Sequence, residues 1–517
     1  MRIGIDVGGT HTDAVILDGH RVVASTKFLT SENVRDGVLG ALDVILEGSG
    51  AAHDAIEAVM IGTTQFTNAV IERRELAATA VIRIALPSGE MIPPMTDWPD
   101  DIADAIGRHC YMVHGGLTYD GFSIGELDDA ELDSVIDDIA AKGIKLVAIS
   151  GVFSPSNPEQ ELIVAERLAR KIPGVGVTLS HKIGGMGLLE RENAAILNTS
   201  LRPLAENVVQ AFRDALAARD ISCPFYISQN DGTLMSAEFA AEFPALTFAS
   251  GPTNSLRGAS LLTQLSDAVV VDIGGTTSDI GVLQGGFPRQ SNVAIKVGGV
   301  RTNFRMPDIQ AIGLGGGSLV SADGGTIGPQ SVGYRLVTEG LVFGGDTLTT
   351  TDIAVAAGVV DIGSTENVSE IASTVIETAM GRMHTIVDDG IDQMKSSRDP
   401  VPVILVGGGA VLVSRDLDNA SELLRPEHAG VANAIGAANA QVGREMERIV
   451  SYREHPREGV LAELQAILSE ELLAAGARKS SIKLADVEET AIAYMADEST
   501  RLRVKMIGDL DFTGSKP

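Results

Sequence analysis

Two glycine-rich segments of the sequence have residue types that could cradle a phosphate. Residues 6–10 read Asp-Val-Gly-Gly-Thr, and residues 272–276 read Asp-Ile-Gly-Gly-Thr. Each stands between two apolar stretches, which predicts a strand, a tight turn and a second strand. Because glycines leave the backbone N–H groups of such a turn unshielded, several N–H groups and a threonine hydroxyl can point at one anion. The aspartate at the strand end adds a hard oxygen ligand that suits Mg²⁺.

The two segments belong to a longer internal repeat. In register, the residues Asp6, Gly8, Gly9, Thr10, Asp13, Leu17 and Gly19 equal Asp272, Gly274, Gly275, Thr276, Asp279, Leu283 and Gly285. One copy alone would indicate an ordinary hairpin, whereas two copies in register predict two facing cradles that hold a triphosphate and its metal from both sides.

The candidate site residues follow from these turns. Asp6 and Asp272 are the predicted metal ligands and catalytic residues, while Asp13 and Asp279 are expected to tie down the turns. A third glycine element after an apolar strand would let a flat ligand approach the backbone closely. The predicted nucleotide-binding residues are Gly8, Gly9, Thr10, Thr12, Gly274, Gly275, Thr276, Thr277, Gly407, Gly408 and Gly409. No Gly-Lys dipeptide exists, so a Walker A loop is excluded.

The elements around these turns indicate an α/β chain, since short apolar runs alternate with helical patterns. Helices are predicted over residues 194–201, 203–219 and 431–450, among others. The 517 residues carry a net charge of −29, which argues against a nucleic-acid partner. The longest apolar run, residues 401–413, is too short to span a membrane. Two distant cysteines exclude a disulfide scaffold, so we expect a cytoplasmic protein.

The order of the two hairpins and the Gly-Gly-Gly element resembles the actin-like ATPase superfamily. Within it, the chain resembles a short variant of the A-type subunit of the ATP-dependent hydantoinase/oxoprolinase family. The matching segments are residues 6–13, 62–74 (Gly-Thr-Thr-Gln-Phe-Thr-Asn-Ala-Val-Ile-Glu-Arg-Arg), 190–191, 250–252, 272–279, 315–318 and 351–352. The resemblance implies duplicated, ribonuclease-H-like domains around a nucleotide cleft. We expect an N-terminal domain over 1–190, a second actin-like domain over 191–450 and a small C-terminal α/β appendage over 451–517.

The resemblance also implies an activity. An A-type subunit uses ATP and Mg²⁺ to phosphorylate the carbonyl oxygen of a cyclic amide of the hydantoin, 5-oxoproline or lactam type. Phosphorylation turns that oxygen into a good leaving group for ring opening, and a B-type subunit commonly completes the chemistry. The alternatives are a small-molecule kinase of the same fold, a ketone carboxylase subunit and, more distantly, an actin-like structural ATPase. A homo-oligomer is left open.

Two further groups of residues receive roles from this resemblance, whereas the histidines receive none. Glu192, at a predicted helix start and without a charged neighbour, is the first candidate to polarise water, and Glu190 is the second. Thr63, Thr64, Thr67 and Asn68 are expected near the substrate or the interdomain cleft, with a helix N-cap at Thr67 as the structural alternative. The histidines His11, His114 and His181 lie near glycine-rich turns but have no metal-site spacing.

Overall fold

The computed structural model describes residues 1–8, 11–29, 34–291, 294–439, 441–453, 455–492 and 499–512. Its largest sheet has nine strands in the order β22-β23-β21-β10-β9-β4-β1-β2-β3. These strands are β1 Arg2–Val7, β2 His11–Asp18, β3 Arg21–Leu29, β4 Ala58–Thr63, β9 Phe225–Ser228, β10 Leu234–Ser236, β21 Val442–Ser451, β22 Lys483–Ala491 and β23 Ser499–Gly508. The antiparallel hairpin β1-β2 is joined on its other side by the parallel strand β4, so the β1 and β4 carboxyl ends meet at one edge.

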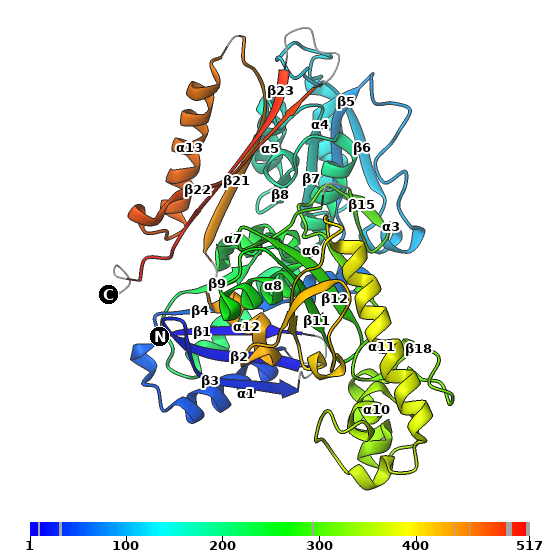
Figure 1. Ribbon diagram of the computed structural model, residues 1–517. Helices are drawn as coiled ribbons and strands as arrows, with labels where there is room; N and C mark the ends of the chain where they lie inside the picture. Colours follow the sequence, from blue (N-terminus) through cyan, green and yellow to red (C-terminus); the bar gives the residue numbers. More distant parts are fainter. Residues whose placement is uncertain are drawn as a thin grey trace.

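The repeat is structural as well as sequential (Figure 1). A second sheet has the order β13-β12-β11-β19-β20, and β16 also pairs with β12. Its strands are β11 Ala268–Ile273, β12 Ser278–Gln284, β13 Phe287–Pro288, β16 Ile309–Ile312, β19 Val401–Val406 and β20 Ala420–Leu424. The β11-β12 hairpin is antiparallel and β11 is flanked by parallel β19, which repeats the relation of β1 to β2 and β4.

A four-stranded parallel sheet is inserted between β4 and β9 in the chain. It has the order β6-β5-β7-β8, with β5 Ala80–Leu86, β6 His109–His114, β7 Leu146–Gly151 and β8 Gly176–Leu179. Its helices are α3 Asp100–Ile106, α4 Asp129–Ala141 and α5 Glu159–Lys171. The two inner strands, β5 and β7, are nearly continuous apolar runs, as expected where helices accompany a parallel sheet.

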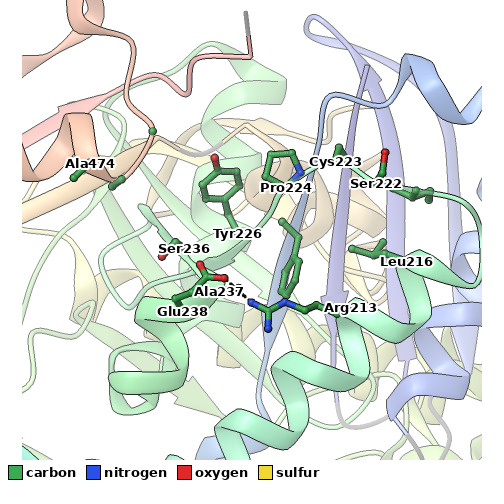
Figure 2. Close-up of a pocket in the computed structure, with 14 residues that line it drawn as sticks. Arg213, Leu216, Ser222, Cys223, Pro224, Tyr226, Ser236, Ala237, Glu238 and Ala474 are labelled. Atoms are coloured by element: carbon green, nitrogen blue, oxygen red, sulfur yellow. Dashed lines mark hydrogen bonds and ion pairs between the residues drawn. The ribbon is translucent and has the colours of Figure 1, made fainter. Parts of the chain in front are cut away.

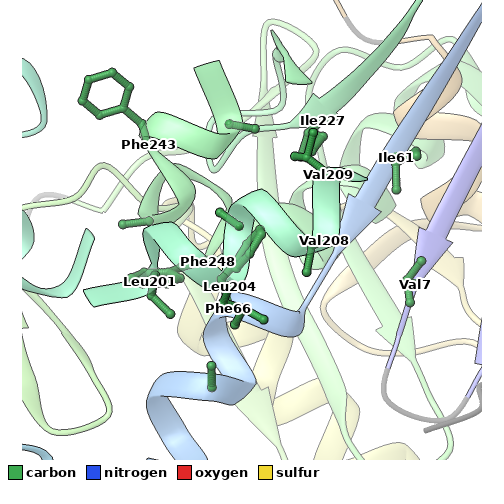
Figure 3. Packing of buried hydrophobic residues seen from close by; sticks show 14 of the residues in the cluster. Val7, Ile61, Phe66, Leu201, Leu204, Val208, Val209, Ile227, Phe243 and Phe248 are labelled. Carbon is green, nitrogen blue, oxygen red and sulfur yellow. The ribbon is translucent and has the colours of Figure 1, made fainter. Parts of the chain in front are cut away.

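We call the part of the chain built on the nine-stranded sheet the first lobe, and the part built on the β11–β20 sheet the second lobe. The core of the first lobe lies between its sheet and the helices α1 Val34–Ser49, α2 Gln65–Glu72 and α6 Leu188–Ala217. Figure 3 shows Phe66 of α2 beside Leu201, Leu204 and Val208 of α6. The two helices predicted over 194–201 and 203–219 are one helix that continues through Pro203. An internal proline costs a helix about 3 kcal/mol. The buried residues on both sides of Pro203 offset that cost.

The helix predicted over 431–450 is wrong beyond its first turns. Residues 432–438 form α12 (Ala432–Ala438), whereas β21 pairs with β23 along its full length. Cross-strand pairing therefore overrides the local helical pattern. Sheet membership also crosses the expected boundaries at 190 and 450, because β9 and β10, β21, and the C-terminal strands β22 and β23 all extend the first sheet. The three-range division stays a prediction.

The two lobes meet at a close helix crossing. Helix α8 (Ser250–Thr263) packs against α12, and glycines make the approach feasible. A Cβ atom added at Gly258 would lie 1.8 Å from the Ala432 carbonyl oxygen, and one at Gly436 would lie 1.9 Å from that of Asn254. Helix α13 (Arg457–Ala474) packs on the C-terminal strands. Within the described ranges, no helix combines the length and the apolar character of a membrane span.

Candidate nucleotide site

The two predicted hairpins share one equivalent backbone hydrogen bond at their turns. Gly8 N donates to His11 O at 3.0 Å, and Gly274 N donates to Thr277 O at 2.9 Å. Thr276 and Thr277 are exposed at the second turn, where their hydroxyls can meet a ligand. Thr12 is buried, and Gly9 and Thr10 lie outside the described residues.

Each hairpin holds two aspartates directly across from one another. Asp6 pairs in register with Asp13, and Asp272 with Asp279. Directly opposed like charges destabilise a strand pair. In the first hairpin, Asp13 is compensated by Lys27 of β3, whose Nζ lies 2.6 Å from its carboxylate. In the second hairpin, Asp279 is paired with Ala311 of β16, so no lysine stands at the position that corresponds to Lys27.

Aspartates of both hairpins have raised pKa values. Burial, reinforced by Asp13, raises the pKa of Asp6 to about 6. Burial also raises the pKa of Asp272, and burial together with the Asp272 charge raises the pKa of Asp279 to about 7. The carboxylates thus carry more negative charge than their surroundings stabilise, and a cation bound between them would relieve it.

Three polar side chains on the crossing helices hold the aspartates, and sequence reasoning missed all three. Asn254 Nδ2 of α8 donates to Asp6 Oδ1 at 3.3 Å, and Asn433 Nδ2 of α12 donates to Asp6 Oδ2 at 3.0 Å. Ser255 Oγ of α8 donates to Asp272 Oδ2 at 2.5 Å. The only available signal was the matching segment 250–252, which begins α8.

Mg²⁺ fits this donor set. The described part of the chain contains no cluster of three or more His, Cys, Asp or Glu suited to a metal. A nucleotide-bound Mg²⁺, however, needs only one or two carboxylates beside phosphate oxygens and water. Asp6 and Asp272 would supply them, and the Asn254 Oδ1 atom next to Asp6 is buried without a hydrogen-bond partner. An oxygen left unpaired in this way is a further hard donor close to the predicted metal.

The second hairpin is braced by two segments far away in sequence. Gly316 N donates to Gly274 O at 3.0 Å, and Gly317 N donates to Gly275 O at 2.7 Å. Thr351 Oγ1 in turn donates to Gly316 O at 2.7 Å, at the start of α10 (Thr350–Ala356). The matching segments 315–318 and 351–352 therefore support the turn. Asp352 itself forms the capping box of α10 with Thr349.

The Gly-Gly-Gly element follows β19 and lies against the second hairpin. A Cβ atom at Gly407 would come within 2.3 Å of Asp272 Oδ1, and one at Gly409 within 2.5 Å of Ile273 Cγ2. Gly408 has open space around its Cβ position. The loop thus offers bare backbone beside Asp272, as a nucleotide base or ribose would require.

The threonine group lies at the end of β4, beside the first hairpin. Thr64 N donates to Val7 O at 3.3 Å, and Thr67 Oγ1 donates to Phe248 O at 2.9 Å. Thr63 is buried and Asn68 is exposed. The N-cap of α2 is Thr64, so the alternative of an N-cap at Thr67 is wrong. A substrate contact by these residues stays a prediction.

Glu192 does not match its expected surroundings. Its carboxylate is fully buried against the inserted sheet, paired with both Nε and Nη2 of Arg83, and it accepts a 2.6 Å hydrogen bond from Ser150. The expectation that Glu192 has no charged partner is wrong. Its partner Arg83 belongs to β5, and no local pattern in the sequence indicates that β5 lies beside α6. Glu190 is partly exposed and lies 3.2 Å from Arg301.

The described residues line two hollows outside the hairpins. One, of about 430 Å³, lies between the end of α6, β9, α7 (Ala237–Glu242) and the end of α13 (Figure 2). Cys223 lines it, and burial raises the pKa of its thiol to about 11, which disfavours a thiolate nucleophile. The other, of about 1070 Å³, lies between the inserted sheet and β21. No described residue of either hairpin turn lines them.

The paired hairpins and the two matching sheets define an actin-like ATPase-type fold. Two family models match the chain: the hydantoinase/oxoprolinase N-terminal region over residues 2–172 and hydantoinase/oxoprolinase over residues 191–364. The chain belongs to the hydantoinase/oxoprolinase family.

Several curated proteins are similar in sequence. The caprolactamase subunit alpha of Pseudomonas jessenii is 24% identical over 383 residues, covering 69% of this chain and 54% of that protein. The 5-oxoprolinase of Saccharomyces cerevisiae is 25% identical over 388 residues, covering 64% and 30%. An uncharacterised protein of Methanocaldococcus jannaschii is 25% identical over 424 residues, covering 76% and 62%. The chain spans less than two thirds of the length of these relatives.

Solved structures share the fold. The ATP-dependent caprolactamase from Pseudomonas jessenii superposes with a TM-score of 0.76 at 18% identity, covering 99% of this chain and 88% of that one. A nucleotide-free acetone carboxylase superposes with a TM-score of 0.68, also at 18% identity and with the same coverages.

Proposed function

We propose that the chain is an Mg²⁺- and ATP-dependent hydrolase subunit that activates the carbonyl of a cyclic amide by phosphorylation for ring opening. The observation that carries this proposal is the pair of matched hairpins whose aspartates, Asp6 and Asp272, are tied to one helix, α8. Family membership and the similarity to a caprolactamase subunit and to 5-oxoprolinase favour a cyclic amide of the lactam, 5-oxoproline or hydantoin type.

The chain's own groups would divide the work as follows. The N–H groups and hydroxyls of the second turn, with Thr276 and Thr277 exposed, bind phosphate oxygens. Asp6 and Asp272 would hold Mg²⁺, which would supply the positive charge that phosphoryl transfer requires. Asn254, Asn433 and Ser255 keep the two carboxylates oriented. Thr63 and Thr64, at the end of β4, would lie on the acceptor side of the cleft.

A second subunit is part of the proposal. One relative is named as an alpha subunit, and the chain spans only part of its relatives' length. We therefore expect ring opening to require a B-type partner, whereas nucleotide binding should need this chain alone.

The decisive measurement is phosphate release from ATP with a panel of hydantoin, 5-oxoproline, ε-caprolactam, a sugar and acetone with bicarbonate, each with and without the partner. Stimulation by a cyclic amide, lost in Asp272→Asn, is the expected result. Stimulation by the sugar alone would instead indicate a small-molecule kinase, and stimulation by acetone with bicarbonate a carboxylase.

A further inference from the structure

The 1070 Å³ cavity contains a histidine held by a buried carboxylate. Glu161, in the first turn of α5, is fully buried, and His181 Nδ1 lies 2.6 Å from its Oε2 atom. His181 stands in the turn after β8 and is 15% exposed. It lines the cavity, whereas Glu161 does not. The imidazole is therefore anchored on its inner side and open on its outer side.

The surroundings of Glu161 keep its carboxylate ionised. Its carboxylate also accepts hydrogen bonds from Ser154 Oγ at 2.6 Å, Ser180 Oγ at 2.5 Å and Gly151 N at 2.9 Å. Although burial alone would raise the pKa of Glu161, the hydrogen bonds and the His181 ring hold it below its usual value. An ionised carboxylate only accepts hydrogen bonds, so His181 Nδ1 carries the hydrogen. The other ring nitrogen, Nε2, has no hydrogen-bond partner among the described residues, so it is available to a ligand.

The rest of the wall suits a small polar molecule. Glu190 lines the same cavity, so two residues singled out separately in the sequence converge there. Glu447 of β21 also lines it, and its Oε1 accepts from Met186 N at 2.8 Å. Phe304 and Arg305 line it as well, and Arg305 Nε lies 3.3 Å from Glu445 Oε1. Charges of both signs beside an aromatic ring favour a ligand with both a donor and an acceptor.

We infer that this cavity is a second small-molecule site, distinct from the nucleotide hairpins, whose ligand forms a hydrogen bond with Nε2 of His181. The inference rests on the proposed function for the nature of that ligand: a cyclic amide and its ring-opened product share an N–H group and a carbonyl-type oxygen. His181 is the binding residue, and Glu161 positions it. Thr63 and Thr64 do not line the cavity, so the site is separate from the acceptor side of the nucleotide cleft.

Isothermal titration of the full chain without nucleotide tests the inference. The probes are two cyclic amides, ε-caprolactam and 5-oxoproline, and their ring-opened forms, 6-aminohexanoate and glutamate. Comparing the two pairs shows whether the site binds the cyclic amide or the ring-opened product. His181→Asn retains a donor toward Glu161 but has no Nε2, and Ser156→Trp fills the cavity from the loop after β7, which also carries Ser154. The matched control is His114→Asn, because His114 forms an exposed pair with Glu131 at 3.1 Å outside the cavity.

We expect at least one probe to bind the wild type, with affinity reduced tenfold or more in His181→Asn and in Ser156→Trp, and unchanged in His114→Asn. If none of the four probes binds, or if both cavity variants bind like the wild type, the inference is overturned. Should one variant fail to fold, the other decides. Amide-stimulated ATP hydrolysis, measured in parallel, separates the two proposals. If a cyclic amide stimulates hydrolysis but the cavity variants bind the probes like the wild type, only the second site is refuted. If the cavity variants lose probe binding but no cyclic amide stimulates hydrolysis, only the proposed function is refuted.

Discussion

Asn254 and Ser255 are consecutive residues of α8, yet each donates to the aspartate of a different hairpin. Asn254 bonds to Asp6 and Ser255 to Asp272. Because successive residues of a helix point in directions about 100° apart, one turn of α8 can reach two lobes at once. A change in the separation of the hairpins must therefore move or break one of these bonds, so α8 couples the positions of the two aspartates.

The first prediction concerns the aspartates. Asp6→Asn and Asp272→Asn keep the size of the side chain but remove the negative charge that would face Mg²⁺, and in Asp6→Asn one of the two accepting oxygens becomes an NH2 group. We expect each to weaken Mg²⁺-ATP binding tenfold or more, measured by titration, with the chain still folded at the temperature of the titration. Wild-type nucleotide affinity in both variants would refute the placement of the site.

The pH dependence of stability provides a second prediction. Because the pKa of Asp6 is raised to about 6 in the folded chain, the metal-free protein binds a proton there that the unfolded chain, near 3.8, has already released. The stabilisation is complete below pH 3.8 and is lost as pH rises through about 6, an effect of about 3 kcal/mol for two pKa units. Asp279 extends the loss toward pH 7.

Thermal unfolding of the metal-free chain between pH 4.5 and 7.5 checks this sign. The wild type should lose stability across the range, and Asp6→Asn should lose less. Parallel curves for the two proteins would show that Asp6 is not the titrating group.

The third prediction concerns the helix crossing. Gly258→Ala places a methyl group onto the Ala432 carbonyl oxygen, so backbone must shift, at a cost of about 1–3 kcal/mol or more. Gly459→Ala, in the first turn of α13, meets no atom within 4 Å and should stabilise the chain slightly. Urea unfolding of both variants makes the comparison, and equal stability of the two would contradict the close approach.

The fourth prediction separates two roles for Glu192. Glu192→Gln leaves the Arg83 guanidinium buried and unpaired, which costs about 3–5 kcal/mol for a buried pair broken on one side. We expect a clear loss of stability, and ATP turnover per folded molecule close to that of the wild type. The opposite pattern, full stability with lost turnover, would restore the catalytic role expected from the sequence.

Local sequence was a good guide where a local pattern decides the structure. The hairpins at 6–13 and 272–279 form as predicted, since glycine turns between apolar strands need no distant partner to be recognised. The segment 431–450 shows the limit: its helical spacing holds for α12, but ten residues of β21 pair with β23, which is distant in sequence. Pairing over such a distance leaves no mark in a local pattern.

The sequence by itself determined the family and the duplicated hairpins, and it proposed Asp6 and Asp272 as the acids of the site, because repeats and turn residues are written in order along the chain. Only the tertiary structure decided which groups surround them. Asn254, Asn433 and Lys27 reach the aspartates through helix crossing and strand register, Glu192 is neutralised by Arg83, and Glu161 meets His181 beside a cavity. Each of these relations joins residues from different elements, and packing of the whole chain sets the distances between elements.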